Sequence, residues 1–446
     1  MPLSYLPTLL SSWFATLVGG FDKRTAPRLF LLLGGALFAR GRRTVTSWFR
    51  AAGITDDFRR AYYALGTAGR QAASLAYRLL SCALLPLMRQ TTGDHLLFAL
   101  DDTPTPRYGP AVQGAGLHHN PTPGPAGEQY VYGHIWVTLA WLARHPRWYT
   151  LALPLRALLY VRAVDVRDLT KQTPWHFQTK LELAAALVGW LKDWVGRTGK
   201  ALWLVADGAY AKRPFLRPAL ERGFVVFSRL RKDACLWSLP PTQRRPGQRG
   251  PLPTYGRQKI DLAKRAGQTG GWQRLSCVQY GRAVVKTIKT FEATWRPVGG
   301  RIRVVLVREE DGWLAFFCTE PTMSAATILE VMADRGAIEQ LFKDLKEVWG
   351  AGQQQVRHVY ASMGAFAVNL TLYSVVEAWA WPRGEAELVD RERSPWDQEP
   401  RRPSHADKRK ALQREILRSE ILTVIGERAE QLEFQNLTQR LLDLAA

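Results

Sequence analysis

Cysteine is scarce in this chain, and its spacing excludes two kinds of small structural site. The 446 residues include four cysteines, and none of them belongs to a Cys-x-x-Cys pair. A zinc ribbon or zinc knuckle needs such pairs, so neither is supported. A disulfide framework is typical of short, cysteine-rich secreted chains. We therefore expect four buried thiols in a reducing compartment, at positions 82, 235, 277 and 318.

Long apolar runs and a nucleotide-binding loop are missing as well. The most apolar run covers residues 29–39 and is too short to span a bilayer. The first residues lack the positively charged stretch of a secretory signal. No Gly-x4-Gly-Lys-Ser/Thr loop is present for binding ATP. We therefore expect a soluble, cytoplasmic protein with no membrane partner and no need for ATP.

Acidic residues are outnumbered by basic ones. The chain holds 61 Lys and Arg against 39 Asp and Glu, which gives a formal net charge of +22. Such an excess favours a polyanionic partner, with nucleic acid ahead of an anionic membrane surface. Some proteins are basic without binding either, so charge alone does not decide the partner.

The first part of the chain, residues 1–92, has apolar residues at helical spacing and little strand alternation. Arg42 and Arg43 precede a short helical pattern that Gly53 interrupts before the next one begins. This arrangement is typical of a helix-turn-helix that binds DNA, although an ordinary helical bundle with solvated arginines fits equally well.

Residues 93–232 show a different pattern, in which short apolar runs alternate with an amphipathic segment. The runs end at turn residues, which is typical of strands separated by helices and favours an α/β domain with a mixed, largely covered sheet. Strands are expected over residues 96–100, 134–141, 148–161, 201–206 and 223–227, and a helix over residues 176–195.

Three further parts follow. Residues 233–325 begin with a loop rich in Pro, Gly and Arg and continue with strand-like pieces, which predicts a β-rich insertion with a basic face. Residues 326–381 contain two helical patterns, at 326–349 and 360–380, which would complete the α/β domain. Residues 382–446 begin with a charged stretch typical of a linker or disordered loop and end in a helix.

Two aspartates follow apolar runs that predict strands. Asp102 ends the stretch Leu-Leu-Phe-Ala-Leu-Asp-Asp, and Asp207 ends Leu-Trp-Leu-Val-Ala-Asp. Ligands of open α/β sheets bind beyond the carboxyl ends of strands, and carboxylate oxygens suit Mg²⁺ or Mn²⁺. For either aspartate alone, a turn residue or helix cap is the commoner explanation. Asp101 competes with Asp102, because adjacent strand residues point to opposite faces.

Glu339 lies among cations on a predicted helix. On a helical wheel Arg335, Lys343 and Lys346 fall in one arc with it, beside the apolar arc that faces the core. Such a stripe would present the carboxylate to metal ions while the cations bind phosphates. Ion pairs four residues apart on a solvated face explain the same pattern.

These residues resemble a known family. Arg335-x3-Glu339-x6-Lys346 reproduces most of the Tyr-x2-Arg-x3-Glu-x6-Lys motif of a large group of bacterial insertion-sequence transposases. Asp102 is followed by Thr, and Asp207 is followed by Gly-Ala-Tyr. These sequence contexts resemble those of the first two acids in that family. The resemblance implies a ribonuclease-H-like catalytic domain that a β-rich insertion interrupts between the second Asp and the Glu, after a helical N-terminal domain.

The resemblance, which runs from about residue 40 to residue 380, also implies an activity. It identifies the chain as similar to DDE transposases, in which Asp102, Asp207 and Glu339 would hold two Mg²⁺ or Mn²⁺ ions. Two metal ions can activate a water and stabilise the leaving 3′ oxygen. The reaction would cleave DNA at transposon ends and transfer the freed strand into target DNA.

The same resemblance implies partners. Double-stranded DNA of the transposon ends and of the target would be bound by a homodimer in the nucleoid of the cytoplasm. Candidate DNA-binding residues are Arg335, Lys343, Lys346, Arg42 and Arg43.

One position departs from the motif, because Met332 stands where the family has Tyr. In the family that Tyr helps to hold a phosphate near the cut. The departure keeps open a catalytically inactive or repurposed DNA-binding relative. A metal-dependent nuclease of the same fold, which cuts without joining, is the other alternative. The terminal repeat, the target sequence and the excision route cannot be read from the residues.

Four aromatic residues outside these motifs have two interpretations each. Trp272 or Trp295 in the insertion would stack on an extruded base, although both are more typical of a β core. His118 and His119, in a loop rich in Gly and Pro, would bind a metal ion, although a structural or DNA-facing role is more typical.

Overall fold

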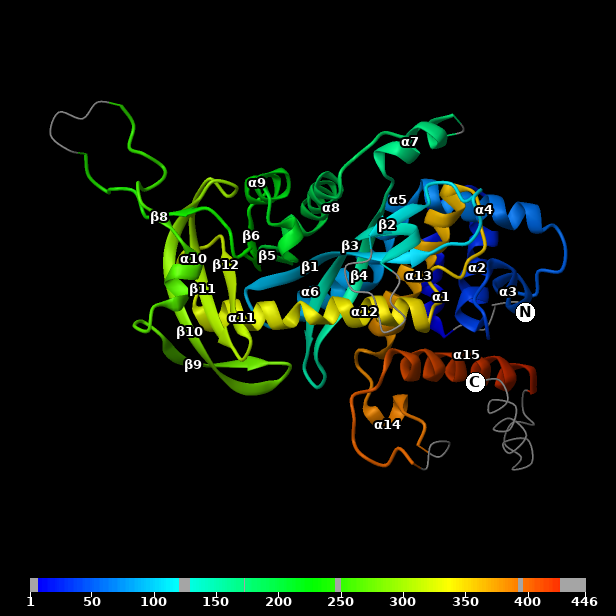
Figure 1. Ribbon diagram of the computed structural model, residues 1–446. Helices are drawn as coiled ribbons and strands as arrows, with labels where there is room; N and C mark the ends of the chain where they lie inside the picture. The colour runs from blue at the N-terminus through cyan, green and yellow to red at the C-terminus, as the bar shows by residue number, and fades with distance from the viewer. Residues whose placement is uncertain (1–6, 120–128, 172, 245–249, 392–395, 426–446) are drawn as a thin grey trace.

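The computed structural model describes residues 7–119, 129–171, 173–244, 250–391 and 396–425. A helical lobe that contains the N-terminal helices lies at one end, and a curved β region lies at the other (Figure 1). One mixed sheet and the long helices α11 and α12 connect the two ends (Figure 1). This is the mixed α/β class that the sequence predicts, and it is consistent with a ribonuclease-H-like domain.

The N-terminal part is helical, as its apolar spacing predicts. Thr44 caps the short third helix by accepting a hydrogen bond from the Ser47 amide, and Gly53 lies in the following turn with φ +70°. The helices are α1 (Thr8–Val18), α2 (Thr25–Phe38), α3 (Val45–Ala51), α4 (Phe58–Arg70), α5 (Ala72–Leu79) and α6 (Leu85–Gln90), with a π-helical turn at Leu80–Leu84.

The central sheet begins with β1, which pairs antiparallel with β3 and parallel with β5. β4 pairs with β3 on one side, and β6 pairs parallel with β5 on the other. The expected ends of β1 were wrong, since residues 103–106 continue the pairing with β3. The strands are β1 (His95–Pro106), β2 (Gly116–His119), β3 (Tyr130–His145), β4 (Tyr149–Tyr160), β5 (Ala201–Ala206) and β6 (Phe224–Arg229).

The segment predicted as a β-rich insertion extends the same sheet. β12 pairs antiparallel with β6 through Cys318–Phe227 and Phe316–Arg229, and the strand order continues β6-β12-β11-β10-β7-β8. The insertion is therefore hydrogen-bonded to the central sheet. Its elements are β7 (Leu236–Trp237), β8 (Lys259–Ile260), α10 (Leu262–Gly267), β9 (Gln273–Gln279), β10 (Arg282–Trp295), β11 (Gly300–Glu309) and β12 (Gly312–Cys318).

Helices cover the sheet and position the candidate residues. The helix expected over residues 326–349 is two helices, α11 and α12, which meet at Arg335. Thr179 and Glu182 cap the start of α8 with a capping box. The helices are α7 (Ala163–Thr170), α8 (Lys180–Val195), α9 (Arg213–Glu221), α11 (Ala325–Asp334), α12 (Gly336–Glu347) and α13 (Val359–Ala380), with 3₁₀ turns at Gly196–Thr198 and Gly208–Tyr210.

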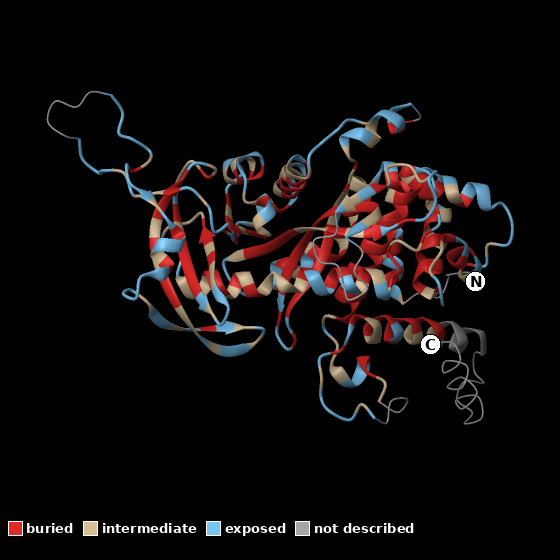
Figure 2. Cartoon of the chain, viewed as in Figure 1, coloured by how far each residue is buried: buried red, intermediate tan, exposed pale blue. Residues whose placement is uncertain are grey.

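Helix α13 is the core helix that joins the helical lobe to the sheet, and burial concentrates around it (Figure 2). By length and composition α13 is apolar enough to cross a membrane, and 83% of its most apolar window is buried inside the fold. Residues Phe58–Arg70 and Ala72–Gln90 pass the same test only as one span bent by 75°. The sequence predicts this helix over residues 360–380, and α13 is longer than the apolar run at residues 29–39.

The segment that the sequence predicts as a linker leads to a helix that is held to α13 by buried ion pairs, which we call the clasp. After α14 (Glu385–Leu388), α15 (His405–Ile425) packs against α13. Glu377 of α13 accepts hydrogen bonds from His405 and Lys408, each at 2.6 Å, and all three side chains are buried. The sequence predicts a helix at the end of the chain, and its part beyond residue 425 lies outside the described residues.

The expectation of four buried thiols was only partly right. Cys277 and Cys318 are buried, Cys82 is half-buried and Cys235 is exposed, and all four are free. Burial raises the pKa of Cys318 to about 12, so this thiol stays protonated.

Candidate active site

The register of two parallel strands brings Asp101 and Asp207 together. Leu100 of β1 pairs with Ala206 of β5, so the next residue on each strand is one of these aspartates. Burial raises the pKa of Asp101 to about 7. Arg335 opposes that rise, whereas the negative charges of Asp102 and Asp207 add to it. Negative charge is therefore concentrated in a sparsely hydrated place, which favours binding of a cation.

Arg335 connects this pair to Glu339. Its Nη1 donates to Oδ2 of Asp101 at 3.0 Å, and its Nη2 donates to Oε1 of Glu339 at 2.6 Å. The Asp101 side chain is 19% exposed and that of Glu339 is 62% exposed. One guanidinium thus spans a half-buried carboxylate and an exposed one, at the point where α11 and α12 meet.

Asp102 has different partners from those of Asp101. Lys180 at the start of α8 donates to its Oδ2 at 2.7 Å, and the Tyr210 hydroxyl donates to its Oδ1 at 2.8 Å. Tyr210 belongs to the 3₁₀ turn that directly follows Asp207. Asp102 therefore braces the turn that carries Asp207, while Asp101 is the acid that shares Arg335 with Glu339.

The cations predicted around Glu339 lie on one side of α12. Lys343 is exposed and Lys346 is half-buried, and burial lowers the pKa of Lys346. The described residues include an Arg335–Glu339 ion pair but none between Glu339 and Lys343. Of the two ion pairs in the alternative explanation, only the first is therefore formed. The residues predicted to face the core are buried, namely Ile338, Leu341, Phe342, Leu345 and Trp349.

The donor set at this place suits a hard divalent cation. In the described ranges, no three side chains of His, Cys, Asp or Glu are close enough together to hold a metal ion. Arg335 lies between Asp101 and Glu339 and donates to both. Asp101 and Asp207 nevertheless supply carboxylate oxygens in a place where burial, and to a smaller extent neighbouring negative charge, raises the pKa of Asp101. Such oxygens are the ligands that Mg²⁺ and Mn²⁺ prefer. Glu339 would join them once Arg335 exchanges its contacts.

A groove beside Asp207 adds cations and an aromatic ring to the site. It has a volume of about 460 Å³, and Lys232 lies 5.3 Å from the ring centre of Trp313 at its wall. Arg231 is paired with Asp233, which leaves a net positive lining. The groove is lined by Asp207, Gly208, Ala209, Arg229, Leu230, Arg231, Lys232, Asp233, Trp313, Leu314 and Ala315.

Trp313 is not among the residues predicted from the sequence, which were Trp272 and Trp295. Trp295 is 7% exposed and packs edge-to-face on Phe317, so the core interpretation of this residue is confirmed. Lys289 and Arg308 lie over the ring of Trp272. Trp313 reaches Asp207 only because β12 pairs with β6. The sequence gives no sign of that pairing, which joins segments far apart in the chain.

The remaining predicted residues lie just before α3 and in β2. Arg42 is exposed, and the backbone amide of Arg43 donates to the Gln353 side chain at 2.8 Å. His118 lies in β2, where burial and nearby Arg162 lower its pKa to about 4. That histidine is therefore neutral near pH 7 and belongs to the sheet.

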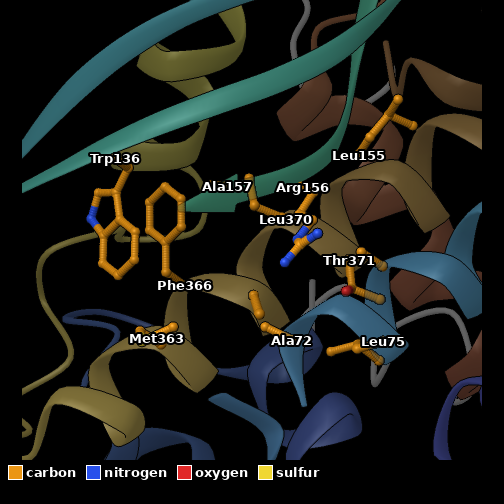
Figure 3. Close-up of a pocket in the computed structure, with 12 residues that line it drawn as sticks. Ala72, Leu75, Trp136, Leu155, Arg156, Ala157, Met363, Phe366, Leu370 and Thr371 are labelled. Atoms are coloured by element: carbon orange, nitrogen blue, oxygen red, sulfur yellow. The ribbon is translucent and has the colours of Figure 1, made fainter. Parts of the chain in front are cut away.

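A cavity under the sheet, drawn in Figure 3, is too small to be the site. Its volume is about 20 Å³, room for about one water molecule. Trp136 of β3 stacks on Phe366 of α13 at a ring distance of 4.1 Å beside it (Figure 3). The cavity is a packing feature between the sheet and α13.

Comparison with known proteins gives one family. The sequence profile of the family described as DDE superfamily endonuclease matches residues 16–297. The matched region contains Asp101, Asp102 and Asp207 and ends before Glu339. None of the curated proteins compared with this chain matches it.

Proposed function

The chain belongs to the DDE superfamily endonucleases, and on that premise we propose that it is a DNA transposase of the Tyr-Arg-Glu-Lys group. It would cut DNA at the ends of a mobile element and join the freed ends to target DNA. The observation that carries this proposal is the contact of Arg335 with both Asp101 and Glu339, beside Asp207.

The three carboxylates that we assign as metal ligands are Asp101, Asp207 and Glu339. Asp101 replaces the sequence-based choice of Asp102, because Asp102 is engaged by Lys180 and Tyr210. Bound Mg²⁺ or Mn²⁺ ions would stabilise the charge that develops on the attacking and leaving oxygens.

The cations of α12 would bind the DNA backbone. When DNA enters, Arg335 would exchange its carboxylate contacts for a phosphate, which offers the same bidentate geometry. Lys343 and Lys346 lie further along α12 and would bind neighbouring phosphates. Glu339 would then be free to turn toward Asp101 and Asp207.

The reaction needs two displacements at phosphorus. In the first, a water oxygen bonds to phosphorus, the bond to the 3′ oxygen breaks, and a 3′-hydroxyl is released. In the second, that 3′-hydroxyl attacks a target phosphodiester and displaces a target 3′ oxygen. The number of phosphodiester bonds is conserved in the second step, so no ATP is required.

We expect the groove beside Asp207 to bind an unpaired nucleotide close to the cut. Aromatic faces bind unstacked bases, and cations bind the attached phosphates. Trp313 and Lys232 offer both at one wall. We expect Trp313→Ala to weaken binding of DNA with a single-stranded end by about tenfold, and Trp313→Phe to retain most of it. If Trp313→Ala and Trp313→Phe bind this DNA equally well, the ring of Trp313 does not stack on a base.

The experiment that tests the activity is cleavage and strand transfer with Mg²⁺ on DNA that carries the element's ends. Wild type should give cut and joined products, and Asp101→Asn, Asp207→Asn and Glu339→Gln should give neither. Asp102→Asn is the matched control and should retain cleavage at a reduced rate. Cutting without joining would leave only an endonuclease. Tight DNA binding without cleavage would instead indicate a DNA-binding relative.

The assembly and location are also proposals. We propose that a homodimer in the nucleoid of the cytoplasm pairs two transposon ends, so that each active site cuts one of them. Light scattering of the DNA complex should then give two chains and two duplexes. A complex of one chain with one duplex throughout the reaction would contradict the dimer.

A further inference from the structure

The turn between β9 and β10 holds a tyrosine in an unfavourable backbone conformation. Tyr280 and Gly281 form a two-residue loop with φ of +51° and +75°. Positive φ at both positions is the pattern of a type I′ turn, which favours Asn, Asp or Gly. The left-handed conformation costs an ordinary residue about 1–2 kcal/mol. Tyr280 is 71% exposed, so burial of its ring does little to offset that cost.

A second tyrosine fixes the tip of this hairpin. A Cβ atom on Gly281 would collide with the ring of Tyr149, which stands at the start of β4. Tyr149 is also in the left-handed region, with φ +60°. The ring of Tyr149 therefore covers Gly281, and the tip is held against the turn between β3 and β4.

This anchoring places Tyr280 over the start of α12. A Cβ atom on Gly336 would lie 3.4 Å from the Tyr280 hydroxyl oxygen and 3.3 Å from its Cε1. Gly336 directly follows Arg335 and precedes Glu339 by three residues, about one helical turn. The hydroxyl is therefore about a turn of helix away from the candidate catalytic glutamate, on the side of α12 that is exposed.

The hydroxyl is also available for a ligand. Tyr280 and Met332 line one cavity of about 130 Å³, in which Lys286 is paired with Glu309. A methionine thioether has no proton to donate, whereas a phenol donates one strongly to an anionic oxygen. Within the part of the chain that the structure describes, the Tyr280 hydroxyl has no hydrogen-bond partner.

We propose that Tyr280 is a binding residue for the DNA backbone, whose hydroxyl donates to a phosphate adjacent to the one that is cut. The inference rests on the proposed function, because it needs DNA to lie along α12. A strained, exposed side chain is retained where its position serves a ligand. Arg335 on one side and Lys343 further along α12 would bind the phosphates that flank this contact.

The test measures binding without cleavage. The probe is a duplex that wild-type protein selects from a random-sequence pool, and affinity is measured in EDTA. Tyr280→Phe, which removes only the hydroxyl, should weaken binding about tenfold, the size of a hydrogen bond to a charged group. Tyr149→Phe is the matched control, since it removes another exposed tyrosine hydroxyl, and it should bind as wild type does.

A methylphosphonate scan locates the contact. Neutralising one phosphate near the cut should weaken wild type and leave Tyr280→Phe unaffected, so that the two changes are not additive. Additive losses at every position would overturn the proposal. If wild type selects no duplex at all, the proposed function itself fails, which is a different result from wild type and Tyr280→Phe binding equally.

A stability measurement separates binding from folding. Tyr280→Asn should relieve the strained turn and raise the melting temperature by a few degrees, yet bind DNA about as weakly as Tyr280→Phe. A rise in stability with a loss of affinity is expected only if Tyr280 is kept for the ligand. A Tyr280→Asn variant that melts lower than wild type would show that the ring serves the fold.

Discussion

At the scale of single residues, the two adjacent aspartates of β1 differ in what holds them. The Asp101 side chain is only 19% exposed and lies beside another carboxylate, and in its pKa of about 7 the loss of hydration outweighs the attraction of Arg335. Asp102 lies between a lysine and a tyrosine hydroxyl that both donate to it. An aspartate carboxylate is therefore destabilised by burial at position 101 and accepts two side-chain hydrogen bonds at position 102.

This difference predicts that the two asparagine variants change the melting temperature in opposite directions. The folded pKa of Asp101 lies above the ordinary aspartate value of 3.8, so the free energy of unfolding falls through this group as pH rises from about 4 to about 7. Asp101→Asn should therefore melt higher than wild type at pH 8 in chelator, by a few degrees, and the gain should vanish near pH 4. Thermal melts across this pH range measure it.

Asp102→Asn is the control for that experiment. It leaves Lys180 without its carboxylate partner, so it should melt slightly lower than wild type at pH 8. If Asp101→Asn also melts lower at pH 8, the ionised carboxylate is not destabilised. Added Mg²⁺ should raise the melting temperature of wild type and not that of Asp101→Asn, because ligand binding stabilises the folded state.

The sequence alone could place the acids but could not choose between these two. Strand alternation implies that only one of Asp101 and Asp102 faces the site, and the following Thr favoured Asp102 by resemblance. The choice depends on the register of β1 against β5 and on where Arg335 points. Neither can be read from a run of apolar residues, since both are contacts between distant segments.

At the scale of elements, α4 and α13 pack more closely than side chains normally allow. A Cβ atom on Gly69 would collide with the backbone of Tyr360, and one on Gly364 with the backbone of Leu65. A Cβ atom on Gly66, one turn earlier in α4, would only touch the Arg70 guanidinium at 4.0 Å and would not collide. Two glycines thus set the distance between the helical lobe and the core helix.

The pair Gly69 and Gly66 gives a matched prediction. Gly69→Ala should lower stability by several kcal/mol, because the two helices must move apart. Gly66→Ala should be neutral or stabilising by about 0.5–1 kcal/mol, since alanine is the better helix former. Urea unfolding of both variants measures the difference. A Gly69→Ala variant as stable as wild type would show that α4 can shift without cost.

The clasp between α13 and α15 predicts a second stability effect. Burial alone would raise the pKa of Glu377, but Lys408 and His405 hold it at about 2. The indole of Trp349, just beyond α12, donates to the other nitrogen of His405 at 2.8 Å. The clasp therefore connects α15 to the chain that follows the glutamate-bearing helix.

Lys408→Met should destabilise the protein by about 3–5 kcal/mol, because it leaves a buried carboxylate without its cation. Lys410→Met changes an exposed lysine on the same helix and should lie within about 0.5 kcal/mol of wild type. The double variant Glu377→Gln with Lys408→Met should regain part of the loss. Denaturant unfolding measures all three, and a loss no larger than that of Lys410→Met would contradict the clasp.

Elements defined by local pattern were predicted well. The strand expected over residues 201–206 has those bounds, and the helix expected over 360–380 begins at Val359. The break at Arg335 was missed, because the apolar periodicity continues through it from α11 to α12. A helix pattern shows which face is buried but carries little information about where the axis is interrupted.

At the scale of the whole molecule, the excess of positive charge predicts how DNA binding responds to salt. Affinity should fall steeply with ionic strength, since phosphate contacts release condensed counterions. Lys343→Ala should flatten the plot of log affinity against log salt by about one unit. Lys410→Ala on α15 should leave the slope unchanged. Equal slopes for both variants would exclude Lys343 from the DNA-binding surface.

The pairing of β6 with β12 limits how far this protein can be shortened. β6 is an interior strand only because β12 covers its outer edge. Removing residues 233–318 would leave a row of unsatisfied amides and carbonyls at the rim of the sheet. Such an open rim recruits strands from other chains. A variant without the insertion should therefore aggregate in solution. Deleting the insertion is thus not a route to a minimal DNA-cleaving domain.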